Sequence, residues 1–295
     1  RSEAAMIVVI TAEEVQQQLS VAGETLSAPD DADFEEAIST RSRTINVALI
    51  GNPNSGKTSL FNAISGGHEH VGNYSGVTVD AKRGEYRYGG YRFVITDLPG
   101  TYALSAYTPE ELYVRRHLVN DTPDVVVNAV VASNLERNLY LTTELIDIDP
   151  KMVVALNMYD ELEASGAVLD YEHLGAMLGV PMVPVVAKTG RGLEALLDTV
   201  IAVYENRDPR VRHIHINNGP VVEQALRPLY ERLRSDRDEL PKHFPPRYFA
   251  MKLLERDKEV EAQLADCPHF AEWIALRDRA VPQVEEELGE DVETA

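Results

Sequence analysis

Residues Gly51–Thr58 of this sequence match the pattern G-x-x-x-x-G-K-[ST]. A short apolar run, Val47–Ile50, precedes the pattern, and a helical pattern, Lys57–Ser65, follows it. A glycine-rich turn between a buried strand and a helix turns backbone N–H groups toward a bound anion, and the helix dipole adds to the attraction. The alternative is a glycine turn that merely joins a strand to a helix. It is disfavoured because every position and both flanking elements agree, so the pattern predicts a phosphate-binding loop.

Apolar runs and helical patterns alternate along the middle of the chain, which is typical of a doubly wound α/β sheet. Gly89-Gly90 separates two further strand-like segments and predicts a hairpin, which would place one antiparallel strand at the sheet edge. The runs that read as strands buried on both faces are Val47–Ile50, Phe93–Thr96, Val125–Val131, Met152–Leu156 and Met182–Ala187. The helical patterns are Lys57–Ser65, Pro109–Val119, Leu135–Ile146, Glu172–Leu178 and Gly192–Tyr204.

Three regions of different composition follow one another along the chain. After a strand-like run at Ile7–Ile10, residues 1–43 are rich in Asp, Glu, Ala, Ser and Thr and have no assigned role. Within them Gly23–Ser42 predicts a poorly packed acidic connector. Residues 44–205 hold the predicted sheet. A polar stretch with loop-forming residues then leads into apolar residues at helical spacing, so residues 206–295 predict a small all-helical domain.

The charge balance and the apolar content exclude several classes of protein. The 28 basic and 48 acidic residues give a net charge of −20, which repels nucleic-acid phosphate and predicts no nucleic-acid partner. No run reaches the roughly 18 apolar residues of a membrane-spanning helix, and the run Met6–Ile10 is too short for a signal peptide. Cys267 is the single cysteine, so no internal disulfide forms. These features predict a soluble, cytosolic chain.

The phosphate loop and a second motif together predict a nucleotide and a magnesium ion. Lys57 is placed to reach the β and γ phosphates, and the Thr58 hydroxyl to ligate Mg²⁺. Asp97 ends a predicted strand and suits Mg²⁺ coordination through water, while the Gly100 N–H suits a γ-phosphate. Alone, D-x-x-G is most often an ordinary turn, but here it lies one hairpin after a phosphate loop. The predicted nucleotide-binding residues of the loop are Asn54, Ser55, Gly56, Lys57, Thr58 and Ser59.

Two later strand ends predict selection of guanine. In Asn157-Met158-Tyr159-Asp160, the Asp160 carboxylate would accept from the ring N–H and the exocyclic amine of guanine, a donor pair that adenine lacks. The backbone N–H groups of Ala187 and Lys188 would contact the guanine oxygen. The alternative for Asp160 is an Asx turn that only ends the strand. All four motifs follow predicted strands, where ligands of open α/β sheets bind.

Over about Ile45 to Leu264 the chain resembles the cytosolic GTPase region of the FeoB family of bacterial ferrous-iron transporters. The resemblance does not extend to residues 1–43. Its motifs in this sequence are Gly51–Thr58 with Leu60-Phe61-Asn62, then Val71–Val79, then Asp97–Tyr102 with Leu104–Tyr107, and finally Asn157–Asp160, where Met158 stands at a position that most GTPases fill with lysine.

The resemblance implies a Ras-like GTPase sheet and roles for several residues. Thr78 would be the switch I threonine that closes on Mg²⁺, Asp97 and Gly100 would belong to switch II, and Asn54 would help to hold K⁺ against the phosphates. The implied catalytic set is Lys57, Thr78 and Gly100, with GTP or GDP, Mg²⁺ and K⁺ as cofactors. The helical segment resembles a domain that regulates nucleotide release.

The resemblance also implies a partner and a place in the cell. The partner would be a membrane-embedded iron-transport domain of the same, longer protein, at the cytoplasmic side of the bacterial inner membrane. That domain is absent from this sequence, and the resemblance leaves self-association of the chain open.

Two positions depart from common GTPase patterns. Thr101 follows Gly100 where Ras-like proteins carry a water-positioning glutamine, which predicts a slow intrinsic rate. Met158 in place of lysine removes a side chain that would brace the phosphate loop, which predicts weak affinity and fast exchange. The sequence therefore indicates a GTP-hydrolysing switch region of a ferrous-iron transporter. Two rivals stay open: a soluble GTPase of ribosome or tRNA metabolism, and a GTP-binding module that does not hydrolyse.

Overall fold

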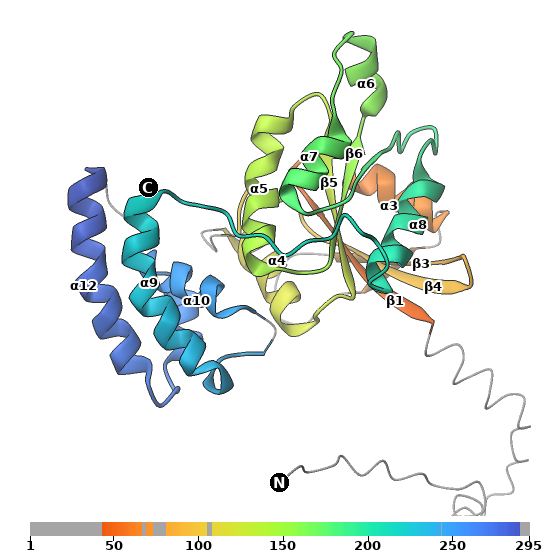
Figure 1. The fold of residues 1–295 in the computed structure, drawn as a ribbon. Helices are drawn as coiled ribbons and strands as arrows, with labels where there is room; N and C mark the ends of the chain where they lie inside the picture. The colour runs from red at the N-terminus through yellow and green to blue at the C-terminus, as the bar shows by residue number, and fades with distance from the viewer. Residues whose placement is uncertain (1–42, 67–68, 73–80, 105–107, 243, 290–295) are drawn as a thin grey trace, which may run out of the picture. The chain divides into compact units, whose positions relative to one another are not determined.

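The computed structural model describes residues 43–66, 69–72, 81–104, 108–242 and 244–289 (Figure 1). Thr78, the strand-like run Ile7–Ile10 and nearly all of the unassigned segment 1–43 lie outside the described residues. Ile45–Ala295 forms one compact unit.

The doubly wound α/β sheet expected from the sequence is present. Its strand order is β2-β3-β4-β1-β5-β6-β7, and β1–β5, β5–β6 and β6–β7 are parallel pairs. The strands are β1 (Thr44–Gly51), β2 (Glu69–Gly72), β3 (Ala81–Tyr88), β4 (Tyr91–Asp97), β5 (Val125–Val131), β6 (Met152–Asn157) and β7 (Met182–Pro184).

The predicted hairpin joins β3 to β4 through Gly89 and Gly90. Both glycines have positive φ, 59° and 80°, as a two-residue hairpin turn requires. The sheet extends one strand beyond this hairpin, because β2 pairs antiparallel with the outer side of β3. The expected antiparallel strand therefore lies one place in from the edge. The edge strand β2 has only four residues, too few to show as an apolar run in the sequence.

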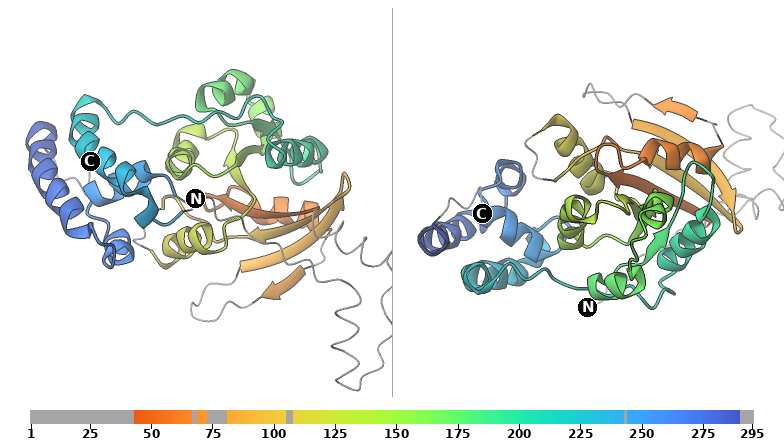
Figure 2. Two further views of the ribbon diagram at one scale, coloured as in Figure 1. Left: turned by 60° about the horizontal axis from the view of Figure 1, so that its bottom comes forward. Right: turned by 90° about the horizontal axis from the view of Figure 1, so that it is seen from above.

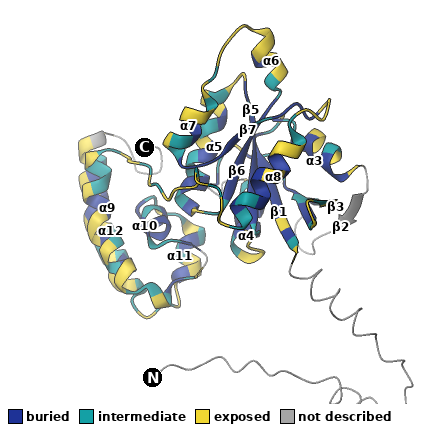
Figure 3. Cartoon of the chain, turned by 45° about the vertical axis from the view of Figure 1, so that its right-hand side comes forward, coloured by how far each residue is buried: buried dark blue, intermediate teal, exposed yellow. Residues whose placement is uncertain are grey.

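Helices cover both faces of the sheet, and the alternation of side chains along β1 decides which core each residue joins. Val47 and Leu49 pack with α3 (Lys57–Ser65) and α8 (Leu193–Tyr204), whereas Ala48 and Ile50 pack with α4 (Pro109–Asn120) and α5 (Leu135–Ile148). Figure 2 shows the two helical layers, and in Figure 3 the central strands are the most buried part of the sheet. The remaining helices at the sheet are α6 (Tyr159–Ala164) and α7 (Tyr171–Leu178).

The carboxyl-terminal residues are helical, as predicted. α9 runs through Pro228 as one helix, and Trp273 is fully buried. The buried apolar side chains of these helices join the core on the α4 and α5 face. The elements are α9 (Pro220–Ser235), the 3₁₀ turn η1 (Arg237–Glu239), α10 (Pro246–Leu254), α11 (Lys258–Leu264) and α12 (Phe270–Leu288). Among the described helices, none is long and apolar enough to cross a membrane.

Candidate nucleotide-binding site

The predicted phosphate loop lies between β1 and α3 and has the backbone that anion binding needs. Asn54 and Gly56 both have positive φ, 66° and 80°, and α3 begins at Lys57 without a side-chain cap and without an acidic residue in its first turn. The first N–H groups of the helix therefore stay available to an anion. Gly56 is required here, because a Cβ atom would lie 2.2 Å from Nδ2 of Asn157.

Lys57, Thr58 and Asp97 meet at the start of α3 and the end of β4. The Lys57 side chain is 7% exposed, and burial lowers its pKa while the Asp97 carboxylate opposes the shift. Thr58 Oγ1 donates to Asp97 Oδ2 at 3.2 Å, so a hydroxyl and a carboxylate that lie far apart in the sequence converge. Hard oxygen ligands of this kind suit Mg²⁺, which ordinarily keeps several waters. The other predicted magnesium ligand, Thr78, lies outside the described residues.

The segment after β4 lies against the phosphate loop. The backbone N–H of Thr101 donates to Gly51 O at 3.2 Å, and a Cβ atom at Gly100 would lie 3.0 Å from Cα of Pro53. Gly100 therefore cannot move toward the phosphate loop without displacing it. The Thr101 side chain is buried, and its hydroxyl donates to Ala103 O at 2.6 Å. The Thr101 hydroxyl is thus engaged in a local turn, so in this structure it does not take the place of a water-positioning glutamine.

Asn157 ties the phosphate loop to the loop that follows β7. Its side chain is buried, with Nδ2 donating to Ser55 O at 3.0 Å and Oδ1 accepting from the Ala187 N–H at 3.1 Å. The Asn157 side chain thus braces the two loops through its own hydrogen bonds and is not free to contact a ligand directly. Because the Ala187 N–H is already used, Lys188, which is exposed, offers the more available backbone donor for a base.

Met158 and Asp160 follow β6 directly. Asp160 is exposed in the first turn of α6, and Met158 adopts a left-handed conformation with φ of 54°. Met158 lies close to the phosphate loop. The Met158 methyl carbon lies 3.3 Å from where a Gly56 Cβ would stand, because a long unbranched thioether can reach as far as the loop.

Sequence reasoning missed the start of α5 as a neighbour of the phosphate loop. Asn52 is buried, and its Nδ2 donates to Arg137 O at 3.1 Å. The Arg137 guanidinium lies over the ring of Tyr102 at 4.5 Å, a cation–π contact with the segment that follows Gly100. These contacts join residues far apart in the chain, and no local pattern indicates them.

A group of potential metal ligands lies in the helical part, away from the phosphate loop. Asp236, Glu239 and His269 place ligand atoms within 4.8 Å of one another. Asp236 Oδ2, however, already lies 2.8 Å from both Arg232 Nε and Trp273 Nε1. Since a guanidinium occupies the place that a cation would take, we interpret this group as a polar network that links the end of α9 and η1 to the start of α12.

Two family models match the sequence of this chain. The model described as ferrous iron transport protein B matches residues 45–200, and the model of the FeoB cytosolic helical domain matches residues 219–295. The chain belongs to the FeoB family. The resemblance carried by the motifs is therefore confirmed.

Known FeoB proteins show the extent of the similarity. The Fe(2+) transport protein A/Fe(2+) transporter FeoB fusion protein of Porphyromonas gingivalis is 49% identical over 266 residues, which is 90% of this chain and 31% of that protein. The Fe(2+) transporter FeoB of Staphylococcus aureus is 35% identical over 240 residues, 81% of this chain and 35% of that protein. The chain spans about a third of the length of these relatives.

Solved FeoB structures share the fold. NFeoB from S. thermophilus bound to GDP.AlF4⁻ and K⁺ has a TM-score of 0.72 at 37% identity, covering 85% of this chain and 93% of that one. The cytosolic domain of the T. maritima FeoB iron transporter in apo form has a TM-score of 0.69 at 32% identity, covering 84% and 98%. The Ras-like GTPase sheet followed by a helical region is therefore confirmed.

Proposed function

We propose that this chain binds and hydrolyses GTP and that its nucleotide state controls ferrous-iron transport by a longer membrane protein. In this proposal residues 44–205 form the nucleotide-binding domain, residues 206–295 form a helical regulatory domain, and residues 1–43 have no assigned role. The membrane-embedded iron pathway of the same protein is the partner, with the present chain on its cytoplasmic side. Hydrolysis is slow on its own and is stimulated by potassium.

The observation that carries the proposal is the convergence of Lys57, Thr58 and Asp97 beside the uncapped start of α3. Bound phosphates would supply the negative charge that a buried lysine favours, and Mg²⁺ would lie between Thr58 and Asp97. Mg²⁺ and K⁺, when bound, would stabilise negative charge on the transferring phosphoryl group. The chain itself positions the phosphates by its backbone N–H groups and by Lys57.

The remaining site residues divide between the base and the ions. Asp160 and the backbone of Lys188 read guanine, while Asn157 and Met158 brace the loop from the side of the base. Thr78 completes the magnesium site and the catalytic set with Lys57 and Gly100. The K⁺ ligand is Asn54, with Ser55, Gly56 and Ser59 lining the phosphates.

Related structures support the nucleotide and K⁺ but concern other proteins. NFeoB from S. thermophilus has been crystallised with GDP.AlF4⁻ and K⁺, and mutants of it with GDP and with GMPPNP. The curated relatives are Fe(2+) transporters. Membership of the FeoB family favours this reading over a GTPase of ribosome or tRNA metabolism. A module that binds GTP without hydrolysis is distinguished by experiment.

Lys57→Ala tests the phosphate site. We expect the variant to lose measurable GTP binding in a calorimetric titration while its circular dichroism spectrum stays unchanged, because the lysine neutralises phosphate charge. Lys258→Ala, at an exposed lysine on α11, is the matched control and should bind as the parent does. Retained affinity in Lys57→Ala would show that the phosphate loop is not the site. Single-turnover hydrolysis by the parent then separates a GTPase from a binding module.

A further inference from the structure

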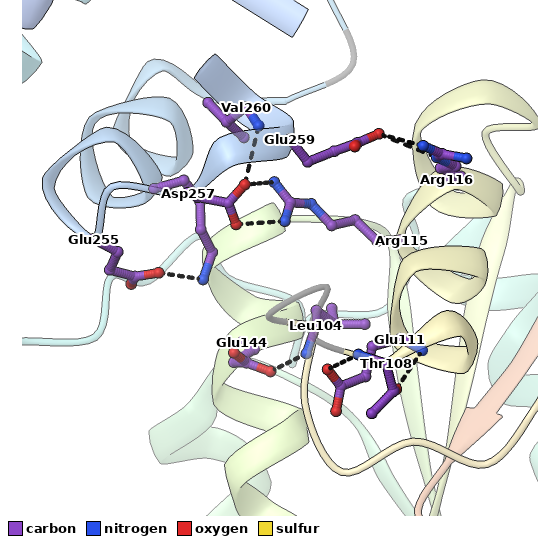
Figure 4. Close-up of polar contacts among 11 residues, drawn as sticks. Leu104, Thr108, Glu111, Arg115, Arg116, Glu144, Glu255, Asp257, Glu259 and Val260 are labelled. Atoms are coloured by element: carbon purple, nitrogen blue, oxygen red, sulfur yellow. Dashed lines mark hydrogen bonds and ion pairs between the residues drawn. The ribbon is translucent and has the colours of Figure 1, made fainter. Parts of the chain in front are cut away.

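Glu144, on α5, contacts the backbone of the segment that follows Gly100. Its Oε2 accepts from the Leu104 N–H at 2.6 Å (Figure 4). Leu104 is buried, so its N–H has little access to water in place of the carboxylate. The same segment is fixed at its other end, where the Thr101 N–H donates to Gly51 O. Residues 101–104 are therefore held between the phosphate loop and α5.

The carboxylate of Glu144 faces charged groups on α4 and on, or directly after, α10. Lys252 of α10 is buried and pairs with Glu255 at 2.6 Å, and Glu111 lies on α4. The pKa of Glu144 is raised to about 7. Burial raises it most, Glu255 and Glu111 also raise it, and Lys252 and the Leu104 N–H lower it. Tyr140 of α5 interacts with the same carboxylate, which raises the pKa of the tyrosine.

We propose that Glu144 is a positioning residue that holds the Gly100–Leu104 segment against α5 and couples it electrostatically to Lys252 of the helical region. The contact itself is independent of nucleotide chemistry, but its kinetic consequence rests on the proposed GTP hydrolysis. Gly100 is the predicted γ-phosphate donor, so restraint of the segment at Leu104 fixes where that donor can lie. Removal of the restraint should slow the chemical step more than it weakens GTP binding.

The hydrogen bond and the proton on Glu144 are linked. Since donation by the Leu104 N–H lowers the pKa of Glu144, loss of the proton must strengthen that hydrogen bond by the same factor. Above about pH 7 the ionised carboxylate therefore holds the segment more tightly, and below about pH 7 the protonated carboxyl holds it less tightly. Restraint of the segment should thus rise with pH through this range.

Two variants separate the contact from the charge. Glu144→Gln keeps a side-chain oxygen that can accept from Leu104 but cannot titrate, and Glu144→Ala removes the acceptor. Glu136→Gln, at an exposed position in the first turn of the same helix, is the matched control. Amide hydrogen exchange of Leu104 in the nucleotide-free chain gives a readout that needs no GTP. Its protection factor corrects for the intrinsic effect of pH on exchange.

We expect the Leu104 protection factor of the parent and of Glu136→Gln to rise about tenfold between pH 6 and pH 8, the difference between a neutral and a charge-assisted hydrogen bond. Glu144→Gln should keep a constant, intermediate value, and Glu144→Ala should lose the protection at every pH. A pH-dependent rise that persists in Glu144→Gln would overturn the proposal, as would full protection in Glu144→Ala.

Single-turnover GTP hydrolysis supplies the kinetic test. The parent rate should rise with a midpoint near pH 7 relative to Glu144→Gln, and Glu144→Ala should lose several-fold in rate with its GTP affinity unchanged. Equal pH profiles of the parent and Glu144→Gln would contradict the positioning role. Absence of hydrolysis by the parent would refute the proposed GTPase activity instead, and the exchange experiment would still decide the role of Glu144.

Discussion

Asn157 Nδ2 donates to the backbone oxygen of Ser55 at 3.0 Å, across 102 positions of sequence. The same side chain accepts from the Ala187 N–H, so one buried amide joins the phosphate loop, the end of β6 and the loop after β7. All three segments carry predicted nucleotide contacts. The phosphate side and the base side of the site are therefore positioned together.

Asn157→Ala should lower both stability and nucleotide affinity. It removes two buried hydrogen bonds and leaves their partners unsatisfied, which costs about 2–3 kcal/mol in the free energy of unfolding. GTP affinity should fall at least tenfold, since the loop loses its brace. Asn128→Ala is the control, because Asn128 is also buried and bonds Thr142 at 2.9 Å. It should destabilise the fold without changing affinity. Equal losses of affinity in both variants would assign the effect to general destabilisation.

Asp160→Asn should change the base that is bound. An amide presents a donor toward the guanine N–H groups where the carboxylate presents an acceptor, so GTP affinity should fall by roughly 10²-fold or more and xanthosine triphosphate should bind better. Because Asp160 is exposed, the stability of the fold should not change. Glu161→Gln, at the adjacent exposed carboxylate, should leave both affinities unchanged. Unaltered GTP binding by Asp160→Asn in a titration would remove this residue from the site.

A buried ion pair joins α4 to the helical region. Arg115 forms two hydrogen bonds with Asp257, at 2.6 and 3.2 Å, and the two side chains are 3% and 6% exposed (Figure 4). Asp257 also caps α11 by accepting from the Val260 N–H at 3.0 Å. Nearby, Arg116 and Glu259 form a pair that is largely exposed. The two pairs have the same chemistry and differ in their access to water.

Asp257→Ala should therefore destabilise the fold far more than Glu259→Ala. The first change leaves a buried guanidinium without its partner and should cost about 3–5 kcal/mol. The second breaks an exposed pair and should cost less than about 1 kcal/mol. Urea denaturation of both variants measures the difference. Similar denaturation midpoints would mean that the α4–α11 contact carries little of the stability.

The sequence predicted the elements that local patterns determine. Val125–Val131 is the strand it was predicted to be, and Lys57–Ser65 is the predicted helix, because buried parallel strands read as unbroken apolar runs and the phosphate loop marks where the helix begins. The strand β2 was missed, since four residues held by pairing with β3 carry no periodicity of their own. A local sequence pattern does not predict strand boundaries that are set by pairing with another strand.

The candidate site follows the same division. The motifs placed Lys57, Thr58 and Asp97 correctly at neighbouring strand ends, because the fold brings the carboxyl ends of parallel strands together. The contacts of Glu144 with Leu104 and of Arg115 with Asp257 could not be predicted. They join residues 40 and 142 positions apart in the sequence, and they depend on how the helices pack in the folded chain. The reach of Met158 to Gly56 is a further case, because only the packed loop shows it.

Asn54 is the residue on which a potassium requirement depends. It is exposed in the phosphate loop with φ of 66°, a conformation that asparagine tolerates better than most residues. Transfer of the γ-phosphoryl group needs positive charge between the β and γ phosphates, which an arginine finger supplies in other GTPases with a gain of about 10³–10⁵ in rate. Thr101 supplies no such charge, and its hydroxyl is engaged with Ala103 O.

A monovalent cation can replace the arginine if the protein provides oxygen ligands for it. The Asn54 carbonyl would be one ligand. Backbone carbonyls of residues 72–76, in the Val71–Val79 motif and mostly outside the described residues, would be others. The ring of oxygens suits K⁺ better than the smaller Na⁺.

GTP turnover by the parent should therefore be faster in KCl than in NaCl at equal ionic strength. Asn54→Ala should lose this stimulation, and Asn62→Ala, at an exposed asparagine of α3, should keep it. Equal parent rates in the two salts would contradict the potassium site. Stimulation that survives in Asn54→Ala would show that the asparagine only braces the loop through an ordinary hydrogen bond.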